Sequence, residues 1–137
     1  MAVRKTEEHP VQSEHDIVLA RQIVRRLCVE LTFGLVDQTK MVTAASELAR
    51  NTLVYGGGGI MICHILQEGA KRGLRLTFQD AGPGIADVSL AMKDGWTSGT
   101  GMGLGLSGAK RLVNEFEIDS VLGKGTRVTV TRWKVSS

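Results

Sequence analysis

No stretch of this sequence approaches the roughly 18 consecutive apolar residues that a membrane-spanning helix requires. The opening residues contain no apolar segment of the kind found in export signals, which predicts a protein that stays in the cytoplasm. Cysteine is also scarce, since Cys28 and Cys63 are the only two and they share no motif spacing. We therefore expect two reduced thiols in the core, a cytoplasmic location and no membrane partner.

A concentrated basic patch is missing as well. The chain carries 17 Lys and Arg against 14 Asp and Glu, for a net charge of +3, and the basic residues are spread along its length. Because nucleic-acid binding leaves a clustered electrostatic footprint, we expect no nucleic-acid partner. No set of Cys and His has the spacing of metal ligands. A length of 137 residues leaves room for one core, so residues 1–137 are expected to form a single domain.

The familiar nucleotide-binding motifs are absent or stand in the wrong context. A P-loop reads G-x-x-x-x-G-K-[ST], and the Gly-Lys pair at 123–124 does not complete it. Residues 103–108 match G-x-G-x-x-G, but no apolar strand precedes them and no acidic residue stands about 20 positions later. The H-R-D and D-F-G motifs of eukaryotic protein kinases do not occur. These absences argue against the P-loop, dinucleotide-binding and eukaryotic kinase folds.

Glycine, in contrast, is abundant: the chain has 17, and nearly half of them lie between Gly82 and Gly108. A glycine inside a regular element destabilises it by roughly 0.5–1 kcal/mol relative to alanine, so this density needs a reason. The usual reason is that backbone amides must lie close to a bound group, most often phosphate. We interpret the segment as one that wraps a nucleotide.

Hydrophobic periodicity predicts an α+β fold, a two-layer sandwich in which a mixed, mainly antiparallel sheet packs on about three helices. Residues 1–12 are either an edge strand or a loose terminus, and Gly34 is expected to end the first helix in the left-handed conformation. The helices are expected at about 16–32, 35–55, 87–92 and 105–116. The strands are expected at about 60–67, 74–79, 117–122 and 127–133.

Four short motifs stand in order along these elements. Glu47 and Asn51 are four residues apart on the second helix, and Asp80 begins D-A-G-P-G after a strand. G-T-G-M-G-L-G then opens a helix at Gly99, and Thr126 ends G-K-G-T before the last strand. In this order and spacing they resemble the N box, G1 box, G2 box and GxGT turn of the GHKL (Bergerat-fold) ATP-binding superfamily. The residues to which the resemblance assigns nucleotide contacts are Asn51, Asp80, Gly82, Gly84, Gly99, Thr100, Gly101, Met102, Gly103, Leu104, Gly105 and Thr126.

The resemblance narrows to one branch of that superfamily. The segments DIVLARQ, FGLVDQTK and KRLVNEFEIDSVLGKGT are similar to the RsbT type of serine/threonine kinase, and the likeness runs from about Glu14 to Trp133. It implies an enzyme that uses ATP and Mg²⁺ to phosphorylate STAS-domain proteins of a bacterial stress-signalling, partner-switching module. It also implies a partner phosphatase that the released kinase activates. The alternative is an ATP-gated binding module, an anti-sigma factor or phosphatase activator with little or no catalysis.

Glu47 and Asn51 project from the same helix face, because they stand one turn apart. Mg²⁺ prefers oxygen ligands, and the Asn51 side-chain carbonyl supplies one without adding negative charge beside a triphosphate. Glu47 is placed to accept the proton of an attacking hydroxyl as a general base. We therefore expect Glu47 to be catalytic and Asn51 to be a ligand of Mg²⁺.

Asp80 predicts which base is bound. A carboxylate accepts a hydrogen bond from the exocyclic amine of adenine, whereas guanine presents a carbonyl oxygen at that place and leaves two acceptors facing each other. Gly82 and Gly84 are expected to adopt positive φ and to let the chain approach the base closely. Thr126 is expected to hydrogen-bond near the base.

Gly101, Gly103 and Gly105 begin the third long helix. Helix N-termini carry unpaired N–H groups and partial positive charge, which suits phosphate oxygens. The segment from Lys93 to Met102 is long and flanked by glycine, so it is a candidate lid that closes over bound ATP.

Overall fold

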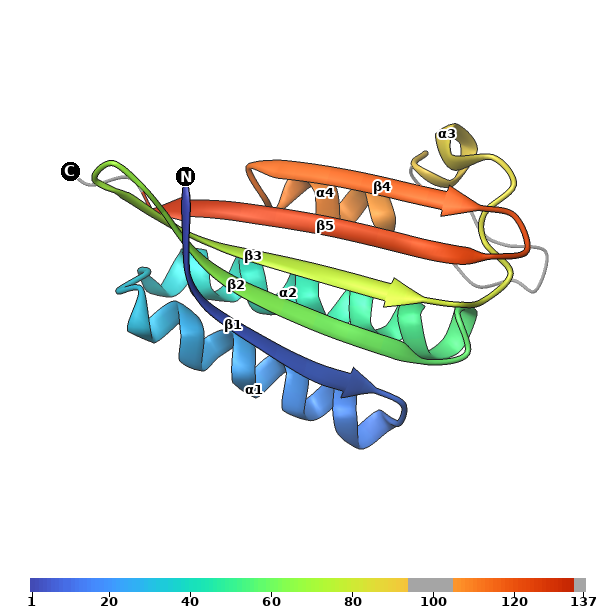
Figure 1. Ribbon diagram of the computed structural model, residues 1–137, viewed down its shortest axis with the longest axis horizontal. Coiled ribbons are helices and arrows are strands. Elements are labelled where there is room, and N and C mark those ends of the chain that lie inside the picture. The colour runs from blue at the N-terminus through green and yellow to red at the C-terminus, as the bar shows by residue number, and fades with distance from the viewer. Residues whose placement is uncertain (94–104, 135–137) are drawn as a thin grey trace.

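The computed structural model describes residues 1–93 and 105–134, which form one sheet with helices on a single face (Figure 1). The strands are β1 (Ala2–Val11), β2 (Gly59–Glu68), β3 (Lys71–Asp80), β4 (Glu115–Val121) and β5 (Gly125–Lys134). The helices are α1 (Glu14–Glu30), α2 (Leu35–Arg50) with its π-helical continuation η1 (Asn51–Tyr55), α3 (Val88–Ala91) and α4 (Leu106–Arg111). Within these described ranges no helix combines the length and apolar character needed to cross a membrane.

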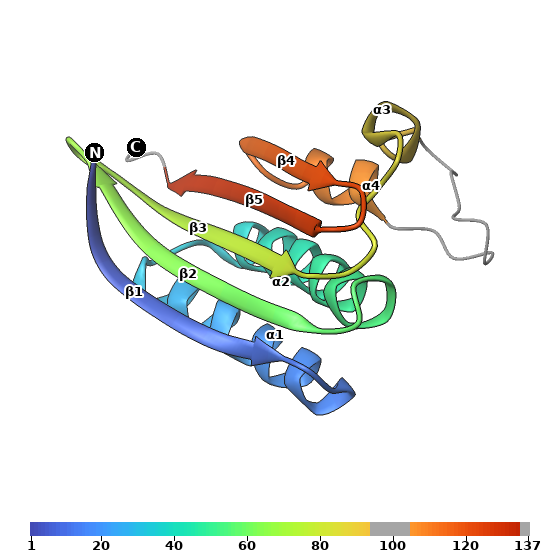
Figure 2. The ribbon, with the colours of Figure 1, turned by 45° about the vertical axis from the view of Figure 1, so that its right-hand side comes forward.

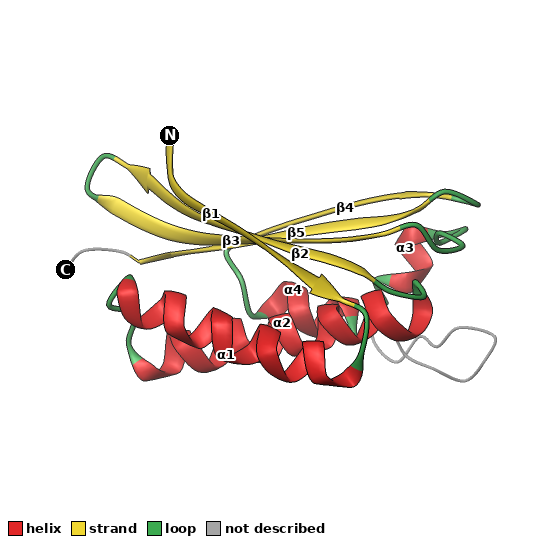
Figure 3. Cartoon of the chain, turned by 60° about the horizontal axis from the view of Figure 1, so that its bottom comes forward, coloured by secondary structure: helices red, strands yellow, loops and turns green. Residues whose placement is uncertain are grey.

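The strand order is β1-β2-β3-β5-β4, and every pairing among the described strands is antiparallel. Figure 3 shows the sheet as one layer and α1, α2 and α4 as the other. The α+β sandwich is therefore confirmed. The expected parallel component of a mixed sheet is not found in these ranges, because short turns join β2 to β3 and β4 to β5 as antiparallel hairpins.

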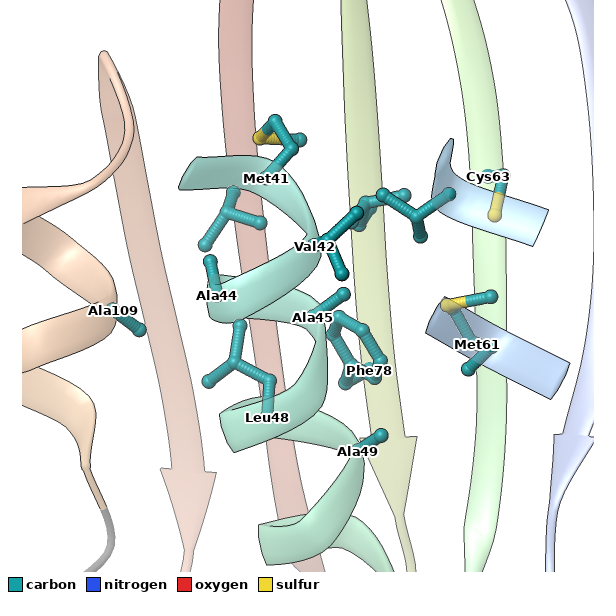
Figure 4. Close-up of a cluster of buried hydrophobic side chains, with 14 of the residues drawn as sticks. Met41, Val42, Ala44, Ala45, Leu48, Ala49, Met61, Cys63, Phe78 and Ala109 are labelled. Carbon is teal, nitrogen blue, oxygen red and sulfur yellow. The ribbon is translucent and has the colours of Figure 1, made fainter. Parts of the chain in front are cut away.

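The core lies between the sheet and helices α1, α2 and α4. Ala44 and Ala45 are fully buried, and these small side chains let α2 approach the strands closely. Leu48 and Phe78 fill the space between helix and sheet, as Figure 4 shows. This packing fixes α2 against β3, so that the ends of these two elements are rigidly related.

Cys28 and Cys63 are buried and free, which confirms the expectation of two core thiols. Burial raises the pKa of both thiols to about 12. They therefore remain protonated at neutral pH and act as small apolar side chains.

The end of α1 differs from the expectation for Gly34. Thr32, with φ of 59°, takes the left-handed position, and Gly34 instead precedes α2 with φ of −66°. The amide of Phe33 donates to the Cys28 carbonyl at 2.9 Å, and the Thr32 amide donates to the Val29 carbonyl at 2.9 Å. This bonding pattern places a hydrophobic residue directly after the left-handed one. Burial of Phe33 therefore decides where the helix ends, although threonine is poorly suited to the left-handed conformation.

The helix expected at 105–116 is shorter in the structure, where α4 ends at Arg111. The amide of Asn114 donates to the Thr131 carbonyl at 2.9 Å and starts the pairing of β4 with β5. Phe116 then lies on β4 and packs on the core from the sheet layer. The alternating exposure from residue 115 to 121 gives this segment a strand period, and pairing with β5 prevails over helix extension.

Residues 1–12 contain an edge strand, since β1 pairs with β2 from Ala2 to Val11. On its helix-facing side, Glu7 Oε1 lies 2.7 Å from Arg26 Nη2 of α1. Lys5 lies 3.2 Å from Glu30, also on α1. These ion pairs connect the edge strand to the helix layer.

The Glu7–Arg26 pair predicts a pH dependence of stability. The hydrogen bonds from Arg26 hold the pKa of Glu7 at about 2, below its ordinary value of 4.5. A lowered folded-state pKa means that the pair stabilises the fold above pH 4.5 and that this stability is lost as the pH falls from 4.5 through 2. Because Arg26 is about half exposed, we expect Glu7→Gln to lower the free energy of unfolding at neutral pH by only about 1 kcal/mol.

Urea unfolding at a series of pH values measures this contribution. The Glu7→Gln protein should lose less stability between pH 4.5 and pH 2 than the wild type. Glu8→Gln is the matched control, because Glu8 is exposed on the opposite face of the same strand. Equal acid sensitivity of wild type and Glu7→Gln would contradict the prediction.

Candidate active site

Glu47 and Asn51 lie where α2 passes into η1. Glu47 is exposed and Asn51 is half-buried, one turn further along the same side. The helix widens at this point, since the amide of Gly56 donates to the carbonyl of Asn51 at 2.9 Å, five residues back. Single π-helical turns of this kind often occur at functional sites, because they re-aim side chains without ending the helix.

Asp80 is held in one orientation at the end of β3. Its Oδ1 atom accepts hydrogen bonds from the backbone N–H of Gly82 at 2.9 Å and of Thr126 at 3.2 Å. In the described part of the chain, no donor is recorded for its other oxygen, Oδ2. Two amides therefore fix the carboxylate and leave one oxygen for a ligand.

Close backbone contacts explain the glycines around Asp80. A Cβ on Gly56 would lie 2.5 Å from Asp80 Oδ2, and a Cβ on Gly82 would lie 2.7 Å from the Gly56 Cα. Gly84 has φ of 74°, as expected, but Gly82 does not have a positive φ. The expected positive φ of Gly82 was therefore wrong. The position needs glycine because another backbone segment packs against it.

Two side chains that the sequence motifs did not single out hold the loop after Asp80. The Tyr55 hydroxyl donates to the Gly84 carbonyl at 3.1 Å. The Ser120 hydroxyl accepts from the Ile85 amide at 2.7 Å. Tyr55 could have been suspected from its place four residues after Asn51, but no signal in the sequence distinguishes Ser120.

These segments enclose one pocket. The end of α2, the end of β3, the start of α4 and the β4–β5 turn lie at the same end of the molecule in Figure 1 and in Figure 2. The pocket has a largely apolar lining that includes three residues of the expected site: Asn51 at the start of η1, and Asp80 and Thr126 on the neighbouring strands β3 and β5. Its lining residues are Leu48, Asn51, Thr52, Tyr55, Phe78, Asp80, Ile85, Leu106, Thr126 and Val128.

The start of α4 comes close to Glu47 at Gly105. Gly105 precedes α4 with φ of 64°, and a Cβ there would lie 2.6 Å from Glu47 Oε2. The start of α4 therefore adjoins the Glu47 carboxylate. The other residues of the G2 box lie outside the described residues, as does the candidate lid beyond Lys93: Gly99, Thr100, Gly101, Met102, Gly103 and Leu104.

The expected Mg²⁺ would depend mainly on oxygens that the nucleotide brings. The described residues contain no group of three or more His, Cys, Asp or Glu that could hold a metal ion. Mg²⁺ often binds through one or two protein oxygens together with substrate phosphates and water. Asn51, on the pocket wall one turn from Glu47, fits that arrangement.

Comparison with known proteins agrees with this geometry. Residues 36–136 match the family of "Histidine kinase-, DNA gyrase B-, and HSP90-like ATPase". The serine/threonine-protein kinase RsbT of Bacillus subtilis (strain 168) is 44% identical, over 90% of this chain and 92% of that protein. The anti-sigma F factor of Thermoanaerobacter sp. (strain X514) is 28% identical, over 83% of this chain and 82% of that protein.

Solved structures share the fold at lower identity. The RsbU and RsbW domains of Rv1364c from Mycobacterium tuberculosis match with a TM-score of 0.64 and 19% identity, over 93% of this chain and 32% of that chain. The mycobacterial sensor histidine kinase MprB matches with a TM-score of 0.54 and 16% identity, over 93% of this chain and 97% of that chain. Because both the family match and the match to RsbT extend over most of its length, the chain belongs to the histidine kinase-, DNA gyrase B- and HSP90-like ATPases, and within them to the RsbT-type serine/threonine-protein kinases.

Proposed function

We propose that the protein transfers the γ-phosphate of ATP to a serine or threonine hydroxyl of a STAS-domain partner, with Glu47 as the general base. The observation that carries the proposal is the position of Glu47. Its carboxylate is exposed and adjoins the start of α4, one helical turn from Asn51, which lines the same pocket as the fixed Asp80. A base open to the surface can be reached by a hydroxyl on another protein.

The Asp80 end of the pocket suits adenine. The Oδ2 oxygen, to which none of the described residues donates, can accept a hydrogen bond from the exocyclic amine, and apolar side chains such as Phe78 and Val128 line the pocket beside it. Guanine would place a carbonyl oxygen against the carboxylate and leave both acceptors without a donor. Thr126 contributes to this selection through its backbone N–H, which holds Asp80 in place.

The opposite end of the pocket suits the triphosphate. Gly105, directly before α4, lies beside Glu47 of α2, and a helix N-terminus attracts anionic oxygens. Bound Mg²⁺ would neutralise charge on the transferring phosphoryl group. Asn51 would supply the protein's oxygen to that ion.

Glu47 would then orient the partner's hydroxyl and accept its proton as the bond to phosphorus forms. The glutamate needs no covalent intermediate for this role. It must only lie within hydrogen-bond reach of the hydroxyl, and its exposed position, one helical turn from the pocket residue Asn51, allows this.

The choice of partner rests on similarity. The relative that is 44% identical is named a serine/threonine-protein kinase, and a more distant one is named an anti-sigma factor. A small kinase domain of this type, placed in a partner-switching module, would alternate between its STAS-domain substrate and a second partner such as a phosphatase. We propose this alternation for the present chain.

Incubation with ATP, Mg²⁺ and a cognate STAS-domain protein tests the proposal. Mass spectrometry should find one phosphoryl group on a serine or threonine of the partner and none when Mg²⁺ is chelated. In parallel, a pull-down with a non-hydrolysable ATP analogue measures docking. Nucleotide-dependent capture of the partner without any phosphorylated product would contradict the kinase reaction and support an ATP-gated binding module instead.

A further inference from the structure

The loop between Asp80 and α3 forms part of the pocket wall, since Ile85 lines the pocket and is nearly fully buried. The segment has no regular secondary structure of its own. Its position is therefore set by hydrogen bonds with other elements: the Tyr55 hydroxyl donates to the Gly84 carbonyl, the Ile85 amide donates to the Ser120 hydroxyl, and the Gly123 amide donates to the Pro83 carbonyl. Of the two bonds made by side chains, the Ser120 bond is the shorter, at 2.7 Å.

Ser120 also contacts the start of β5, its neighbouring strand. Its Oγ atom lies 2.8 Å from Thr126 Oγ1 and donates to the Gly125 carbonyl at 3.3 Å. Thr126 in turn donates its backbone N–H to Asp80 Oδ1. One hydroxyl thus joins the loop that carries Ile85 to the turn that holds the base-recognising carboxylate.

The hydrogen-bonding capacity of Ser120 is fully used in this arrangement. A serine hydroxyl can donate once and accept twice. Here it donates to the Gly125 carbonyl, accepts from the Ile85 amide and can accept from the Thr126 hydroxyl. Ser120 itself does not line the pocket, so any influence on a ligand passes through Ile85 and Thr126.

The position is unusual for its strand. The other two residues of β4 that face the core side, Phe116 and Ile118, are apolar and pack on the core. A third apolar residue would continue that pattern and bury more apolar surface. A serine at this place gives up that gain, and the two segments that it joins, the loop at Ile85 and the start of β5 at Thr126, both line the nucleotide pocket.

We propose that Ser120 is a positioning residue of the nucleotide site. Its hydroxyl fixes the positions of Ile85 and Thr126 relative to each other, so that the pocket wall and Asp80 are aligned for adenine. Ser120 thereby sets the affinity for ATP and the preference for adenine over guanine, and it takes no part in phosphoryl transfer. The inference rests on the proposed function only in naming ATP as the ligand.

The Ser120→Ala protein tests this role. Removing the hydroxyl leaves the Ile85 amide without its acceptor and frees the turn at Thr126, so we expect the Kd for ATP to rise roughly 5- to 30-fold. KM for ATP should rise in step while kcat is unchanged, because ground-state binding alone is weakened. The ratio of GTP to ATP dissociation constants should fall. Calorimetry gives the dissociation constants, and steady-state kinetics gives the split between KM and kcat.

Three further variants separate positioning from general stability. Ser120→Thr keeps the hydroxyl on a residue that suits a strand and should retain most of the ATP affinity. Tyr55→Phe removes the hydroxyl that donates to the Gly84 carbonyl but keeps the ring, and should raise the Kd for ATP about 2- to 10-fold. Thr129→Val is the matched control. The Thr129 hydroxyl belongs to the same sheet, lies 3.5 Å from Thr77 Oγ1 and has no bond to the loop. Thr129→Val should leave ATP affinity unchanged even if the protein melts earlier.

The outcomes distinguish the role of Ser120 from the proposed kinase reaction. If wild type and Ser120→Ala bind ATP equally well with the same base preference, the inference is wrong. A fall in kcat at constant affinity would also overturn it. If the wild type binds ATP but phosphorylates no partner, the proposed kinase reaction fails, while the comparison of dissociation constants still tests Ser120. If the wild type binds no ATP, both claims fail.

Discussion

Replacing Glu47 by glutamine is expected to lower kcat for phosphoryl transfer by about 10²- to 10⁴-fold, the range typical of a lost general base. Glutamine keeps the size of the side chain and its place on α2, but its amide cannot accept the proton of the attacking hydroxyl. ATP affinity should stay near the wild-type value, because the Asp80 end of the pocket is untouched. Single-turnover transfer from labelled ATP measures the first effect, and calorimetry measures the second.

Glu68→Gln is the matched control for this experiment. Glu68 is an exposed glutamate in the β2–β3 hairpin, at the opposite end of the molecule from the end of α2 (Figure 1). The control should transfer phosphate at the wild-type rate. Wild-type transfer by the Glu47→Gln protein itself would show that the hydroxyl loses its proton to another acceptor, and the assignment of Glu47 would be withdrawn.

The Asp80→Asn substitution should weaken ATP binding roughly 5- to 150-fold. The amide oxygen can still accept from the N–H groups of Gly82 and Thr126, so the side chain keeps its orientation. Its NH₂ group then takes the place of Oδ2 and faces the exocyclic amine of adenine, which sets two donors against each other. Guanine presents an acceptor there, so the same change should improve the relative binding of GTP.

Calorimetry with ADP and GDP, which avoids turnover, gives the four dissociation constants needed. Asp87→Asn serves as the control, because Asp87 caps α3 at an exposed position and asparagine caps a helix about as well as aspartate. A uniform loss of affinity for both nucleotides in Asp80→Asn, with no change in their ratio, would show that Asp80 supports the pocket without reading the base.

Local patterns carried enough information to predict most of the elements. The apolar spacing of α1 and α2 and the alternation of β3 follow from the periods of helix and strand, and both were read correctly within a few residues. The N box was predictable for the same reason. Glu47 and Asn51 share a helix, so their separation of one turn already places them side by side.

The predicted helix ends were wrong where a contact with a distant residue decides the local conformation. Thr32 takes a left-handed conformation because Phe33 must be buried, and nothing in the neighbouring sequence favours threonine over Gly34 for that position. In the same way α4 ends at Arg111 because Asn114 pairs with Thr131, a residue 17 positions later in the chain. A window of local sequence does not contain either partner.

The candidate site shows the same division. Asp80 and the glycines were assigned by their motifs, yet the reason for Gly82 is its contact with the backbone of Gly56, which follows η1 and belongs to none of the motifs. Tyr55 and Ser120 belong to no motif, and only the folded chain brings them to the loop after Asp80.

The sequence by itself determined the chemistry proposed for this protein, because the carboxylate, amide and glycine positions expected to bind and use a nucleotide follow short, regular spacings within single elements. Only the tertiary structure decided how those parts are aligned. The orientation of Asp80, the approach of α4 to Glu47 and the bracing of the pocket wall by Ser120 depend on contacts between residues far apart in the chain. Such contacts exist only once the sheet and the helix layer have packed together.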